Sequence, residues 1–168
     1  MSVAPSVRRI VAVAGVVLLV VSLGISFAML RHTAVVTCEP SVIAPIPIYY
    51  NNANSAPLVP GAKAPTQFWV LDNPATMLTL RTYHYVAPKG VAAPGKVGLV
   101  GPDGTIYGPW QAIGSPSADG VPNTYWQATT DVVLAPGLYT VTDSDPATWS
   151  VNAGTDGAGM YLVTGYIK

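Results

Sequence analysis

An apolar run near the N-terminus limits this chain more than any other feature of its sequence. From Ile10 to Leu30 there are 21 consecutive residues without a charged side chain, IVAVAGVVLLVVSLGISFAML. A helix of that length reaches roughly 31 Å at about 1.5 Å per residue, which matches the hydrocarbon core of a bilayer. The sequence therefore predicts one membrane-spanning helix at residues 10–30, preceded by a short cytoplasmic arm at residues 1–9.

The position of this run also predicts where the rest of the chain lies. A short arm with a long apolar run behind it resembles a signal sequence, which directs the downstream chain across the membrane. We therefore expect residues after the run to be periplasmic or extracellular. Ser26-Phe27-Ala28 offers small residues that suit a signal peptidase, but the run is longer than the roughly 7–15 residues of a signal core. We expect it to stay as an anchor, and cleavage remains the alternative.

The exported part has few charges and a single thiol. Beyond Arg31 there are five Lys and Arg residues against eight Asp and Glu residues. Because phosphate binding needs a basic surface, we expect no nucleic-acid partner. Cys38 is the only cysteine, so no internal disulfide can form. A free thiol and a bridge to another chain both remain open for it.

Prolines dominate the segment after the apolar run. Six of them lie between Glu39 and Pro65, which excludes a helix and favours extended backbone. We expect an extended tether at residues 31–65. Its first half is too apolar for a free linker, so it forms either an edge strand on its own domain or a contact with a partner or the membrane surface. The apolar residues predicted for such an interface are Val42, Ile43, Ile46, Ile48, Tyr49 and Tyr50.

Residues 66–168 alternate between strand-like runs and turn dipeptides such as Pro-Gly, Asp-Gly and Asn-Pro. Seven or eight short strands without a helix signal predict an all-β domain of two packed antiparallel sheets, a sandwich or jelly roll. The predicted strands are Gln67–Leu71, Met77–Val86, Val97–Val100, Thr105–Trp110, Tyr125–Leu134, Leu138–Asp143 and Met160–Ile167.

No residue pattern in this region predicts catalysis. Nucleophilic catalysis needs a base beside a Ser, Thr or Cys, and beyond His32 the only histidine is His84. Alternation places His84 on one strand face with Leu78 and Leu80, and Met77 on the other, which favours a hydrogen-bonded structural histidine. A glycosidase needs two carboxylates, and Glu39 is the only glutamate. We expect no enzyme activity and no cofactor.

Three aspartates and two tryptophans are the candidate binding residues. Asp143, Asp145 and Asp156 lie in predicted turns, where such side chains either cap backbone amides or supply oxygen ligands to Ca²⁺. Trp126 and Trp149 lie beside predicted loops. They fill the core between the sheets, or they are exposed and anchor a protein interface or stack on sugar rings.

Several motifs resemble one family of exported bacterial and archaeal β-sandwich proteins. They include RTYHY at residues 81–85, YGPWQA at residues 107–112, LAPGLYTV at residues 134–141 and DSDPATWS at residues 143–150. The resemblance covers about residues 66–168 and implies a β-sandwich fold. It implies no activity and assigns no functional residue.

These features favour two functions. The first is a non-enzymatic, single-pass accessory subunit whose exported domain stabilises a larger membrane complex, with respiratory and photosynthetic complexes as candidates. Small residues such as Gly15, Ser22 and Gly24 suit close packing of its helix against others. The second is a surface module that binds carbohydrate or another envelope polymer, with Ca²⁺ as a possible aid.

Overall fold

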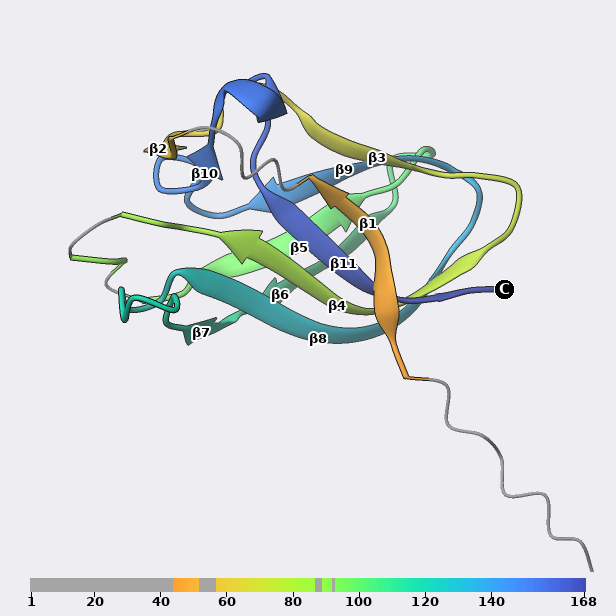
Figure 1. The fold of residues 1–168 in the computed structure, drawn as a ribbon. Helices are drawn as coiled ribbons and strands as arrows, with labels where there is room; N and C mark the ends of the chain where they lie inside the picture. The colour runs from red at the N-terminus through yellow and green to blue at the C-terminus, as the bar shows by residue number, and fades with distance from the viewer. Residues whose placement is uncertain (1–43, 52–56, 87–88, 92) are drawn as a thin grey trace, which may run out of the picture. The chain divides into compact units, whose positions relative to one another are not determined.

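The computed structural model describes residues 44–51, 57–86, 89–91 and 93–168 (Figure 1). The predicted arm, the predicted anchor at residues 10–30, Cys38, Val42 and Ile43 lie outside the described residues. Within the described ranges, no helix has the length and apolar character needed to cross a bilayer. The described residues from Ala44 to Lys168 form one compact unit.

Two antiparallel sheets make up the unit, which confirms the all-β architecture predicted for it. The first has five strands in the order β1-β11-β4-β8-β7, and the second has four in the order β3-β9-β5-β6. The short strands β2 and β10 pair separately, and one 3₁₀ turn, η1, lies at Ala153–Thr155. The strands are β1 Ile46–Asn51, β2 Val59–Pro60, β3 Thr66–Val70, β4 Ala75–Tyr83, β5 Lys96–Val100, β6 Ile106–Gln111, β7 Ile113–Ser115, β8 Tyr125–Leu134, β9 Gly137–Asp143, β10 Ser150–Val151 and β11 Tyr161–Ile167.

The core lies between the two sheets and is built from alternate residues of their strands. Phe68 of β3 stands at its aromatic centre. Its ring stacks on Tyr49 at 4.7 Å and on Tyr139 at 5.6 Å between ring centroids, and Tyr161 lies 5.8 Å away. These rings come from β1, β3, β9 and β11, so both sheets contribute to one aromatic cluster.

A bulge in β4 changes which of its residues point inward. Simple alternation places Met77 on the face opposite Leu80, but both side chains are completely buried. In the pairing of β4 with β11, Thr164 and Gly165 are consecutive but their partners Thr79 and Met77 are not. Leu78 is therefore an extra residue in β4, and it lets Met77 and Leu80 both enter the core. That part of the sequence interpretation is therefore wrong, while Thr82 and His84 do point inward as expected.

The proline-rich segment contributes two strands to the compact unit. β1 pairs with β11 at the edge of the five-stranded sheet (Figure 1), where proline is tolerated because one side of the strand needs no donor. Of the two alternatives for this segment, the structure places residues 46–51 in the edge strand. β2 then pairs with β10. The folded unit therefore begins before residue 66, because β1 supplies Tyr49 to the aromatic cluster.

Candidate functional site

A histidine and an aspartate meet in the interior, between the two sheets. His84 lies just beyond β4, Asp143 ends β9, and both side chains are fully buried. The Nε2 of His84 lies 3.1 Å from Oδ2 of Asp143. The imidazole also stacks on the indole of Trp126, with ring centroids 3.8 Å apart and an interplanar angle of 17°.

Each polar atom of this buried pair has a partner. The Thr82 hydroxyl donates to Oδ2 of Asp143 at 2.9 Å, and the backbone N–H of Asp145 donates to Oδ1 at 2.8 Å. Thr148 Oγ1 lies 2.9 Å from Nδ1 of His84. A carboxylate only accepts, so the short Nε2 contact requires that His84 carries a proton on Nε2. The histidine is therefore buried and hydrogen-bonded, as the sequence predicted.

The three aspartates that the sequence suggested for Ca²⁺ have different surroundings in the structure. Asp143 is committed to His84 and Thr82, and Asp145 accepts a 2.9 Å hydrogen bond from the Thr148 hydroxyl. Asp156 is the C-cap of η1, in the left-handed region at φ 52°. Among the described residues there is no group of three His, Cys, Asp or Glu side chains that could hold a metal ion. The turn-capping alternative describes Asp143, whose side chain accepts from the backbone N–H of Asp145.

The two tryptophans suggested for an interface lie inside the domain. Trp126 is 1% exposed and Trp149 is 4% exposed, so neither can stack on a sugar ring or anchor a partner at the surface. The Trp149 Nε1 donates to the carbonyl of Met160 at 2.7 Å. Trp126 faces inward with the alternation of β8, whereas Trp149 lies just before β10 in a run of four buried residues. The sequence alone left both directions open.

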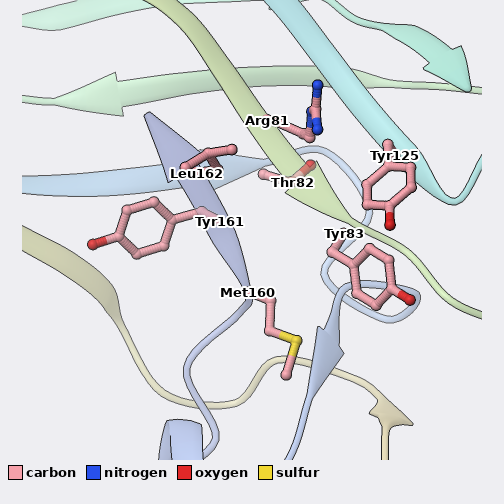
Figure 2. A pocket seen from close by; sticks show the side chains of 7 residues that line it. All are labelled: Arg81, Thr82, Tyr83, Tyr125, Met160, Tyr161 and Leu162. Atoms are coloured by element: carbon pink, nitrogen blue, oxygen red, sulfur yellow. The ribbon is translucent and has the colours of Figure 1, made fainter. Parts of the chain in front are cut away.

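A groove on the outer face of the five-stranded sheet is the clearest concave site among the described residues. It encloses about 300 Å³. Figure 2 shows Arg81, Tyr83 and Tyr125 gathered on one side of it, with Leu162 of β11 on the other. The lining residues are Arg81, Thr82, Tyr83, Tyr125, Met160, Tyr161 and Leu162.

One wall of this groove is a row of side chains in contact from β4 and β8, and the row continues beyond the groove to Tyr85, two residues after β4. Tyr85 stacks on Tyr83 at 6.2 Å, and Tyr83 lies 5.0 Å from Tyr125 between ring centroids. The guanidinium carbon of Arg81 lies 5.3 Å from the centroid of the Tyr125 ring. Arg81 Nε donates to Oε1 of Gln127 at 2.9 Å. These contacts hold the side chains of the row in place without a ligand.

The charge of Arg81 is not neutralised within the part of the chain that the structure describes. The only ion pair found there joins His84 to Asp143, and the acceptor that Arg81 uses is the neutral amide of Gln127. Burial, together with the neighbouring Tyr125, raises the pKa of Tyr83 to about 12, so its hydroxyl stays neutral at physiological pH. The wall therefore presents one cation and neutral hydroxyl groups.

An exposed apolar surface lies on the outer face of the other sheet. Trp69 of β3 is 61% exposed, Leu71 just beyond it 71%, and Ile106 of β6 70%. Trp69 pairs with Leu138 across the β3–β9 ladder, and Ile106 pairs with Val100 across β5–β6. We call this surface the Trp69 face, and its members are Trp69, Leu71, Val100, Ile106 and Leu138.

The structure divides the apolar residues of the proline-rich segment between surface and core. Ile46 is 56% exposed and Tyr50 is 66% exposed, so both remain free for contact. Ile48 and Tyr49 are half-buried and pack against the core. The sequence reasoning named Tyr49 but missed Trp69 and Arg81. One feature of the sequence could have pointed to Trp69: the predicted strand Gln67–Leu71 has apolar residues on both faces.

Comparison with known proteins adds no assignment: no protein-family model matches the chain, and neither a curated protein nor a solved structure is significantly similar to it. The candidate sites therefore rest on geometry and chemistry alone.

Proposed function

We propose that this protein is a non-enzymatic accessory subunit, held in the membrane by residues 10–30, whose exported β domain binds another protein of a larger membrane complex through the Trp69 face. The observation that carries this proposal is the 61% exposure of Trp69 beside the exposed Leu71. The motif resemblance to exported β-sandwich proteins belongs to the same proposal. It supports an extracytoplasmic location for the domain.

The Trp69 face has the composition of an interface centre. Tryptophan is enriched among residues that dominate binding energy, and the centre of an interface is depleted of charge. Within β3, β9, β5 and β6 the only charged residues are Asp143, whose side chain is buried, and Lys96 at the start of β5. The polar neighbours on the face are uncharged, as in the hydrogen bond from Gln67 to Thr140.

The buried histidine supports a binding role over a catalytic one. General-base chemistry requires that the base reach a substrate proton. His84 has no exposed surface, and both of its ring nitrogens contact neighbouring side chains. Its surroundings are those of a structural pair that joins β4 to β9.

The proposal predicts that the full-length protein migrates as a stoichiometric large complex after its own membranes are solubilised in mild detergent. Mass spectrometry of the comigrating proteins would name the partner. Trp69→Ala should release the protein from that complex, because the variant removes the largest exposed apolar side chain of the face.

The matched control is Val133→Ala on β8 of the opposite sheet, where Val133 is 52% exposed. This variant also truncates an exposed apolar side chain, and it should stay in the complex. Migration of the wild-type protein as a lone monomer would sink the accessory-subunit role. Retention of Trp69→Ala in the complex would move the interface away from this face.

A further inference from the structure

We propose that the groove walled by Arg81, Tyr83 and Tyr125 binds an acidic polysaccharide, with the Arg81 guanidinium holding the carboxylate of a uronic acid unit. This site lies on the sheet opposite to the Trp69 face, and it does not depend on the accessory role.

Charge is the first argument for an anionic ligand. Arg81 is partly buried on a sheet face, and its hydrogen-bonding partner among the described residues is the neutral Gln127. A guanidinium presents five N–H donors in a planar fork that matches a carboxylate, and a single amide oxygen uses two of them. Asp119, the nearest acid along the row, is engaged by Tyr85 at 2.6 Å and by the Ser117 hydroxyl. It is therefore not the partner of Arg81.

The position of the groove argues against a peptide as the ligand. β4 is paired on both sides, with β11 and β8, so its backbone groups cannot accept an additional strand, the common way in which a sheet binds an extended peptide. A ligand here is recognised by side chains alone. Those side chains are aromatic rings, neutral hydroxyl groups and one guanidinium, which suit a hydroxyl-rich ring with a single negative charge.

A second hollow argues for a polymer rather than a single sugar. It also encloses about 300 Å³ and lies along β7 and β8, lined by Ile113, Gly114, Ser115, Gln127 and Thr129. Arg81 borders both hollows. Each volume falls at the lower end of the roughly 300–1,000 Å³ of small-ligand sites. Two such hollows on either side of one guanidinium fit consecutive units of a chain.

The test uses the full-length protein in detergent and titrates it with a tetramer of galacturonic acid in a calorimeter. The matched ligand is the same tetramer with its carboxylates methyl-esterified, which removes the charge and keeps the sugar backbone. The acid should bind at least about tenfold more tightly than the ester, because a hydrogen bond to a charged group contributes about 1.5–3 kcal/mol. This comparison needs no variant, so it does not depend on the folding of a mutant.

Two variants then locate the site. Arg81→Gln should weaken binding of the acid by about tenfold or more and should remove the difference between acid and ester. Trp69→Ala should bind the acid as the wild type does. The proposal is overturned if acid and ester bind equally, if Arg81→Gln binds as the wild type does, or if a tetra-aspartate peptide of the same charge binds more tightly than the sugar.

The outcomes separate this site from the proposed accessory role. Loss of the complex in Trp69→Ala with unchanged sugar binding would support both sites. Loss of sugar binding in Arg81→Gln within an intact complex would show that the groove works independently of the interface.

Discussion

The buried pair of His84 and Asp143 shows how single residues hold the two sheets in register. Burying two polar groups costs free energy unless each of their atoms finds a partner. Asp143 accepts through both oxygens, and His84 is contacted at both ring nitrogens. The satisfied network specifies one alignment of β4 against β9, because a slip of either strand would leave a buried donor or acceptor without a partner.

Asp143→Asn should destabilise the domain by about 3 kcal/mol. An amide has one acceptor oxygen, so its NH₂ group would face a donor whichever way the side chain is turned. Urea unfolding followed by tryptophan fluorescence measures the change. Asp145→Asn is the control, since among the described residues its side chain hydrogen-bonds with Thr148 alone, and it should cost less than about 1 kcal/mol. Equal losses in the two variants would contradict the importance of the buried pair.

At this scale the sequence predicted the role of His84 but not the exposure of the tryptophans. The environment of His84 could be predicted from its own strand, because alternation places this residue on the same face as apolar neighbours. Trp69 and Trp126 lie in strands with apolar residues on both faces, so alternation divides the residues without telling which side faces the core. Which face points to the core depends on where the opposing sheet packs, and the sequence of the strand itself does not show this.

Among the elements, β11 holds a glycine that leaves no room for a side chain. It lies between β1 and β4 (Figure 1), and its pairing with β4 shifts register between Thr164 and Gly165. A Cβ added at Gly165 would overlap the backbone carbonyl of Thr76 in β4. Glycine is needed at this place because the neighbouring backbone comes too close for a side chain.

Gly165→Ala should lower the free energy of unfolding by about 1–3 kcal/mol or more, since the overlapping atom belongs to the backbone and cannot turn away. Thermal unfolding followed by circular dichroism measures the effect. Gly104→Ala serves as the comparison. Gly104 has a φ of 82° and nothing within 4 Å of an added Cβ, so this variant should cost only the backbone strain of about 1 kcal/mol. A smaller loss in Gly165→Ala than in Gly104→Ala would contradict the predicted close approach.

All seven strands predicted from alternation and turn residues are present, with ends that differ by at most three residues. The sequence could not reveal β7, which has three residues, or the bulge in β4, since a bulge inserts a residue without a composition of its own. The groove was also beyond reach. Arg81 meets Tyr125 and Gln127 only through the register of β4 with β8, and register is a tertiary property.

At the scale of the whole molecule, three buried tyrosines make the stability of the fold depend on pH in the alkaline range. Burial raises the pKa of Tyr161 to about 12, and the pKa values of Tyr139 and Tyr83 also rise to about 12, chiefly through burial. In the unfolded chain a tyrosine ionises near pH 10. Between about pH 10 and pH 12 the folded state therefore holds more protons than the unfolded state.

This difference predicts that stability falls as the pH rises from about 10 to about 12, because the unfolded state gains by releasing protons that the folded state retains. Below about pH 10 these three groups contribute no pH dependence. Urea midpoints at pH 9, 10, 11 and 12, with the absorbance of tyrosinate recorded in parallel, measure the effect. Tyr161→Phe should reduce the slope, and ionisation of all tyrosines near pH 10 without unfolding would contradict the prediction.

The place of β11 in the five-stranded sheet has a consequence for how this protein is made. Ile46 pairs with Gly165, and Asn51 pairs with Tyr161, so the edge strand emerges from the ribosome long before the strand that completes it. β4 likewise waits for its neighbour on that side. Contacts between distant parts of a chain form slowly because a long loop must close first. The five-stranded sheet therefore cannot be completed until residues 161–167 have been synthesised.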